Sequence, residues 1–210
     1  MHIEQGVLAA ARIAAADVVA LGLVGGAAWL ALQRPALWLR TALAAAFFTL
    51  CMQSFFLKVG PSKLHFVGAM PMYLVLGLVP TLLGFAFGLL LQGLLFKPAD
   101  LLHLSVNTLS LAMPLLAVHA ALGRRLARID LRAVVRLDAT YYAGVTAMVA
   151  FWLTFGEVAA PMTAWARFAA SYLAVVALEP IVTVAVLFGV RRWRVQRWAA
   201  WCFDTRAAVH

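Results

Sequence analysis

The chain has 210 residues, of which 65% are hydrophobic and 12% are charged, with a mean hydropathy of +0.95. Soluble domains carry roughly 25% charged residues, so this composition excludes a soluble domain and indicates an integral membrane protein. The net charge of +9 does not predict nucleic-acid binding, because the basic residues cluster between apolar runs and do not follow one helical face. At about 20 residues per span, we expect six or seven helices in one transmembrane domain over residues 1–210, with lipid as the solvent.

Apolar runs, each bounded by charged residues, Pro or Gly, predict about seven helices in chain order. We place them at Ile13–Leu32, Thr41–Leu57, Phe66–Val79, Thr81–Phe96, Ser105–Leu122, Ala139–Phe155 and Phe168–Val190. Pro80 separates the short third helix from the fourth, because proline removes a backbone donor, and we expect these two helices to form a tight hairpin. The predicted fold is an all-α, polytopic membrane helix bundle.

The 17 basic residues predict the orientation in the membrane. Alternating the loops between the two sides places twelve on one side and five (Arg12, Lys58, Lys63, Lys97 and Arg167) on the other. The twelve are Arg34, Arg40, Arg124, Arg125, Arg128, Arg132, Arg136, Arg191, Arg192, Arg194, Arg197 and Arg206. By the positive-inside rule, the N-terminus lies outside and the C-terminus in the cytoplasm, as expected for a multi-pass protein of a bacterial inner membrane.

The first two residues, Met1 and His2, can form a metal chelate. The free α-amine, the peptide nitrogen of His2 and its imidazole Nδ1 supply three nitrogens in fused rings, and this planar set suits Ni²⁺ or Cu²⁺. His65, at the outer mouth of the third helix, is the best-placed fourth ligand. By spacing alone, a frayed terminal His2 and an interfacial His65 are the more common explanation.

Several further motifs accompany this terminal pair. They are Met1-His2-Ile3 with Gly6, Gln53, His65-Phe-Val-Gly68, Gln92-Gly-Leu-Leu-Phe96, Leu104-Ser-Val-Asn107-Thr-Leu, and Glu179 with Thr183. In this order they resemble the CbiM/NikM family, the metal-specific substrate-binding components of energy-coupling-factor ABC importers. The resemblance implies uptake of Co²⁺ or Ni²⁺ as the transported ion, with no cofactor, and it implies that Met1, His2 and His65 hold the ion.

The chain departs from the family pattern in three places. Lys97–Asp100 replaces a glycine-rich turn, Leu109–Ala112 replaces a Leu-Asn-Met-Gly stretch, and Glu179 is flanked by Leu178 and Pro180. These departures indicate a divergent branch, and they bear most on the identity of the metal and on the coupling partners.

The sequence contains no phosphate-binding loop and no hydrolase or metalloprotease motif, so we expect a transport component and not an enzyme. The resemblance implies that ATP is hydrolysed by two partner ATPase subunits. An energy-coupling transmembrane subunit and a small accessory membrane protein are the other implied partners.

The remaining polar residues leave alternatives open. Gln53 and Asn107 either orient His65 and the terminal segment or bond other helices, and His103 is a reserve ligand. His119 and His210 fall on the cytoplasmic side and are not expected to be ligands, and Cys51 and Cys202 are expected to be structural.

The alternative function is an ion- or proton-coupled secondary transporter that uses the intramembrane carboxylates Asp17 and Glu179. An intramembrane enzyme or assembly factor is a third possibility.

Overall fold

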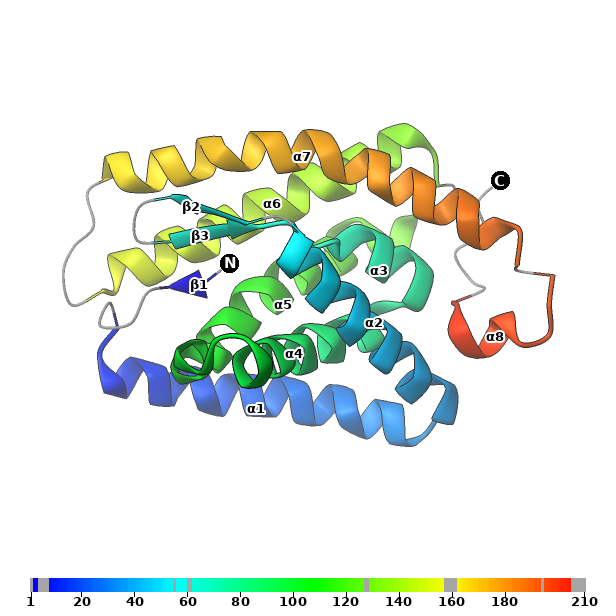
Figure 1. Ribbon diagram of the computed structural model, residues 1–210, viewed down its shortest axis with the longest axis horizontal. Coiled ribbons are helices and arrows are strands. Elements are labelled where there is room, and N and C mark those ends of the chain that lie inside the picture. The colour runs from blue at the N-terminus through cyan, green and yellow to red at the C-terminus, as the bar shows by residue number, and fades with distance from the viewer. Residues whose placement is uncertain are drawn as a thin grey trace.

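The structure is a computed structural model that describes residues 2–3, 8–54, 56–59, 62–126, 129–156, 162–193 and 195–204. Side chains are described for these residues except 2–3, 56–59, 62–64, 125 and 164. The long helices are α1 (Ala10–Leu32), α2 (Pro35–Ser54), α4 (Leu78–Leu95), α5 (Leu104–Ala121), α6 (Leu131–Thr154) and α7 (Met162–Arg191). The shorter ones are α3 (Ala69–Leu76), α8 (Ala199–Cys202) and the 3₁₀ turns η1 (Pro98–His103) and η2 (Gly123–Arg125). Each predicted apolar run corresponds mainly to one helix from α1 to α7, and the third also includes the first two residues of α4, which confirms the all-α membrane bundle (Figure 1).

A small antiparallel sheet of three strands lies among the helices at one end of the bundle (Figure 1), and the sequence did not predict it. Its strands are β1 (His2–Ile3), β2 (Phe56–Val59) and β3 (Ser62–His65), in the order β1-β3-β2. The predicted second helix extended to Leu57, whereas α2 ends at Ser54 and the chain turns into β2. Strands of two to four residues are too short to show the alternating pattern by which a strand is recognised in sequence.

The third and fourth helices separate at Gly77 and not at Pro80. Gly77 has φ +95°, a conformation that glycine adopts without steric cost. Pro80 lies in the first turn of α4, where the missing N–H would have had no partner within the helix. The C-terminal segment packs on this turn, because Asp204 N donates to Val75 O at 2.6 Å.

Not every helix is a candidate membrane span. At about 1.5 Å per residue, the eight residues of α3 cover about 12 Å, less than half of a hydrocarbon core of about 30 Å. Five helices in the described part of the chain are long and apolar enough to span: α1, α2, α4, α5 with η1, and α7. Helix α6 has 24 residues but carries Arg132, Arg136 and Asp138 in its first eight. The chain is a multi-pass membrane protein, as predicted.

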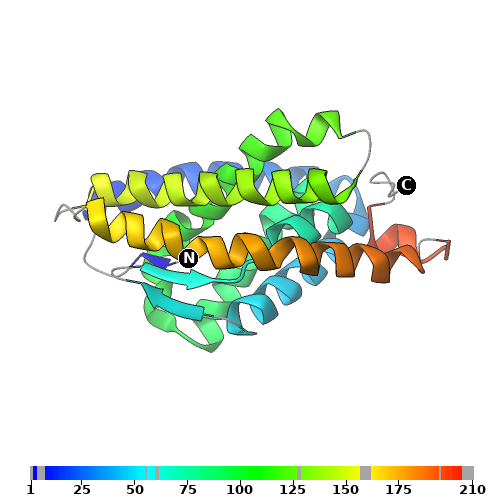
Figure 2. The same ribbon diagram turned by 90° about the horizontal axis from the view of Figure 1, so that it is seen from above.

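Close helix packing surrounds α3. All eight of its residues are buried, and it packs against α2, α4, α6 and α7. Gly84 and Gly88 allow α4 to approach α2, because a Cβ at Gly84 would lie 2.5 Å from Ala44 Cβ and one at Gly88 would overlap the Phe48 ring. Helices α6 and α7 run side by side along the length of the molecule (Figure 2). Because it packs against α2, α4, α6 and α7, the short helix α3 is enclosed by long helices.

The two ends of the long axis differ in charge. The turns between α1 and α2 and between α5 and α6, together with the end of α7 and α8, lie at the end opposite the sheet (Figure 1). These segments contain Arg34, Arg124, Arg191 and Arg192. The grouping matches the twelve-residue side of the predicted topology, and which end faces the cytoplasm stays a prediction.

Candidate metal-binding site

His65 is the last residue of β3 and is 6% exposed. Its Nδ1 lies 3.2 Å from the carbonyl oxygen of Met52, in the last turn of α2. A carbonyl oxygen only accepts hydrogen bonds, so Nδ1 carries the proton and donates. The ring is thereby held in the tautomer whose Nε2 can ligate a metal, an arrangement typical of metal-binding histidines.

The sheet brings the N-terminal strand to His65. β1 pairs with β3 so that His2 is opposite Lys63, two residues from His65 on the same strand. Diagonal neighbours of this kind have Cα atoms about 7–8 Å apart. The backbone of His2 therefore lies within side-chain reach of His65, whereas Met1 lies outside the described residues.

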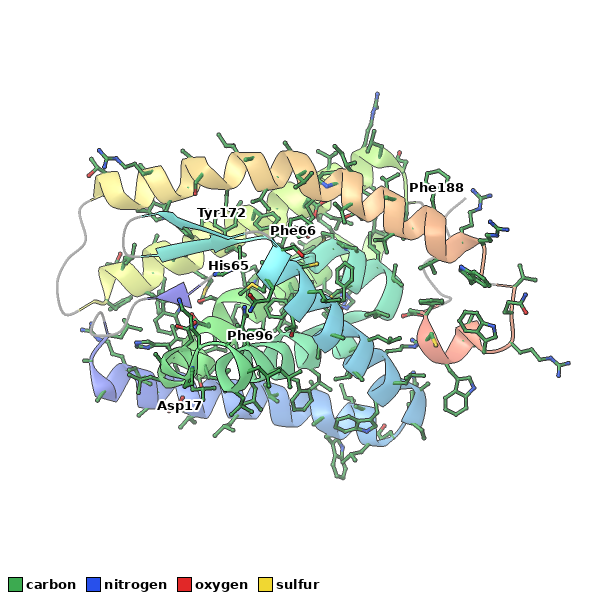
Figure 3. All side chains as sticks on the ribbon, in the orientation of Figure 1. Asp17, His65, Phe66, Phe96, Tyr172 and Phe188 are labelled. Carbon is green, nitrogen blue, oxygen red and sulfur yellow. The ribbon has the colours of Figure 1, made fainter. Side chains whose placement is uncertain are left out.

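The segment that follows His65 is fixed on both sides. Phe66 and Val67 are buried at 7% and 0% exposure, and Gly68 has φ +65°. A Cβ at Gly68 would lie 2.6 Å from Phe47 Cε1 and 3.1 Å from Cys51 Sγ of α2. On the other side, Glu179 of α7 accepts a hydrogen bond from Met70 N at 3.1 Å. Figure 3 shows His65 and Phe66 where β3 leads into α3.

The amides proposed to support the site differ in their surroundings. Asn107 of α5 is 1% exposed, so its amide lies inside the bundle, whereas the side chain of Gln53 of α2 is exposed. The neighbour of Gln53, Met52, supplies the carbonyl that orients His65. Both roles stay predictions.

His103 is more deeply buried than the sequence suggested. It is 1% exposed, and neither ring nitrogen has a hydrogen-bond partner among the described residues. It ends η1 and directly precedes α5, and β1 lies against both of these elements. Its position beside β1 keeps it as a reserve ligand.

The two carboxylates of the alternative transporter hypothesis lie apart. Asp17 is partly exposed on α1, whereas Glu179 is fully buried in α7, on the opposite side of the bundle (Figures 1 and 3). Among the described residues, the other buried carboxylate is Asp138 of α6, which is 0% exposed. The structure thus gives no support to a pathway that joins Asp17 to Glu179.

Three tyrosines accompany this acidic pair, a cluster that the sequence analysis missed. The hydroxyl of Tyr142 donates to Glu179 Oε2, and Tyr141 and Tyr172 pack on the Tyr142 ring with centroids 5.2 and 5.1 Å away. Asp138, Tyr141 and Tyr142 are spaced three and four residues apart on α6, so they share a face. That spacing was visible in the sequence, but the predicted sixth helix began at Ala139.

His119 lines the cavity at the arginine-rich end, and its exclusion as a ligand stays a prediction. Its Nδ1 is 2.7 Å from the hydroxyl of Tyr73. Both side chains line a cavity of about 630 Å³ with Arg34, Arg40 and Arg124. His210 lies outside the described residues.

Among the described side chains, which do not include that of His2, no group of three or more His, Cys, Asp or Glu is arranged to hold a metal ion. The assignment of Met1, His2 and His65 as ligands stays a prediction.

Comparison with known proteins identifies the family. Residues 2–197 match the CbiM family, described as the cobalt uptake substrate-specific transmembrane region. The chain belongs to this family. As a CbiM-family protein, it is a membrane component of metal uptake, and the metal ion is its cargo.

Two solved structures share the fold of this CbiM-family chain. One, titled as a transition metal transporter, has a TM-score of 0.72 and 18% identity, covering 94% of this chain and 95% of the other. The second, titled as a truncated transition metal transporter, has a TM-score of 0.73 and 18% identity, covering 91% and 99%. No curated protein matches the sequence at a significant level.

Proposed function

We propose that this protein is the substrate-specific component of an energy-coupling-factor importer for Co²⁺ or Ni²⁺. The ion is held by the α-amine of Met1, the peptide and imidazole nitrogens of His2, and Nε2 of His65. The observation that carries the proposal is the pairing of β1 with β3, with His2 opposite Lys63.

The local chemistry supports this ligand set. The Met52 carbonyl at 3.2 Å fixes the tautomer and the orientation of the His65 ring. Burial of Phe66 and Val67 fixes the backbone that carries the ring. A ligand that is held before the metal arrives loses little conformational freedom on binding, which favours high affinity. Four nitrogens in a plane suit Ni²⁺, and the same donors accept Co²⁺.

The partner subunits belong to the same proposal. The sequence contains no nucleotide-binding loop, so transport driven by ATP requires a partner that hydrolyses it. Following the family resemblance, the proposed partners are two ATPase subunits and an energy-coupling transmembrane subunit. We place their contact at the arginine-rich end, where the cavity lined by Arg34, Arg40 and Arg124 opens. A small accessory membrane protein is a further proposed partner.

Metal analysis of the purified protein tests the proposal. A chain tagged at the C-terminus should bind Ni²⁺ or Co²⁺ in a 1:1 ratio by isothermal titration calorimetry and by elemental analysis. The matched form, with one added Ser ahead of Met1, should remain folded and lose tight binding, because the donor amine becomes an amide. Equal affinity of the two forms would refute the terminal chelate, and absence of metal binding in the C-terminally tagged chain would refute the proposed function.

A further inference from the structure

Glu179 is a buried carboxylate that the proposed ligand set does not use. It is 0% exposed within α7, and a charged group in the membrane is costly unless it is paired or hydrogen-bonded. Its two oxygens have different partners: Oε1 accepts from Met70 N at 3.1 Å, and Oε2 accepts from the hydroxyl of Tyr142. Glu179 therefore joins α3 to α6 and α7.

The contact with α3 lies at the first turn of that helix. The first backbone N–H groups of a helix have no partner within it, and the residue before α3 is Gly68, which has no side chain to cap them. Glu179 supplies the cap from another helix, since its Oε1 accepts from the N–H of Met70, the second residue of α3, at 3.1 Å. A carboxylate at this position is favoured by the helix dipole as well.

Three residues separate the same turn from His65. Residues 66–68 connect the ligand to α3; all three are buried, and Gly68 lies against Phe47 and Cys51 of α2. His65 is held from α2 through the Met52 carbonyl, and the start of α3 is held from α7 through Glu179. Loss of either anchor would let the His65 backbone move relative to β1.

We propose that Glu179, held by Tyr142, is a positioning residue for the metal site: by capping α3 it fixes the segment that carries His65. The proposal rests on the proposed metal-binding function. Glu179 does not contact the ion in this scheme. It acts through the backbone, and Tyr142 holds its carboxylate in the orientation that reaches Met70.

Paired tyrosine variants test the proposal. Tyr142→Phe removes the hydroxyl that donates to Glu179, whereas Tyr172→Phe removes a buried hydroxyl that has no hydrogen-bond partner among the described residues. Both changes delete one oxygen from a buried ring on neighbouring helices. Tyr142→Phe should weaken metal binding by about 10- to 100-fold, the range for groups that support a ligand, and Tyr172→Phe should leave it unchanged. Glu179→Gln, which keeps an acceptor for Met70 N but loses the charge, should weaken binding by a smaller factor.

Hydrogen exchange in the metal-free protein separates this proposal from the proposed function. Amides of residues 66–74 should exchange faster in Tyr142→Phe than in wild type or Tyr172→Phe, with the rest of the chain unchanged. Unchanged exchange, or wild-type affinity in Tyr142→Phe, would overturn the positioning role even if the wild-type protein binds metal. If the wild-type protein binds no metal, the proposed function fails, and the positioning role that rests on it fails too. The exchange data then report only whether Glu179 caps α3.

Discussion

Gly68→Ala perturbs the segment between His65 and α3, and the structure gives the size of the effect. Gly68 has φ +65°, and a left-handed conformation costs an L-residue about 1–2 kcal/mol. The new Cβ would also lie 2.6 Å from Phe47 Cε1 and 3.1 Å from Cys51 Sγ. Phe47 is partly exposed, so its ring can move at a cost of about 1 kcal/mol, the low end for an overpacked core. The substitution should therefore lower the free energy of unfolding by about 2–3 kcal/mol.

Gly25→Ala is the matched control. It adds the same methyl group in α1, where no atom lies within 4 Å of the new Cβ, and removal of a helical glycine stabilises by about 0.5–1 kcal/mol. Unfolding of both variants in mixed micelles, followed by tryptophan fluorescence, gives the two free energies. If the strain moves residues 66–68, Gly68→Ala should also bind metal about tenfold more weakly or worse, since each factor of ten corresponds to about 1.4 kcal/mol. Equal stability of the two variants would refute the argument from backbone conformation and packing.

Three further predictions follow from the ligand set and the charge distribution. Metal affinity should fall steeply from about pH 8 to 6, because the ligands must lose their protons before they bind the ion: an α-amine has a pKa of about 7.7–8.0 and an imidazole one of about 6.5. Calorimetric titration in buffers of different ionisation enthalpy should show that more than one proton is released per ion bound. His65→Ala should abolish tight binding while His103→Ala changes it little, as measured by calorimetry, and the reverse order would mean that His103 is the fourth ligand. Reporter fusions should place residue 1 outside and residue 210 in the cytoplasm, and a cytoplasmic N-terminus would contradict the proposed outward-facing site.

Much of the candidate site could be predicted from local sequence because its motifs are local. The N-terminal pair and the His65 segment are each contiguous, and their likeness to one family pointed to a shared function. The sequence did not predict that Asp138 is buried. Arg132 and Arg136 lie close to it in the chain, and such a charged stretch is typical of a loop. Its burial depends on α7 covering that face of α6, a contact that no single segment encodes.

Composition and hydropathy were sufficient to determine the solvent and the helical class of this chain. In lipid, backbone groups must bond within the segment, which leaves helices as the form for apolar runs of this length. The tertiary structure alone decided three features: the break at Gly77, the enclosure of the eight-residue α3, and the pairing of β1 with β3. Each depends on contacts between residues far apart in the chain, because a short strand or helix is stable only against a partner. The relation between His2 and His65 belongs to this second group, since pairing across about 60 residues brings them together.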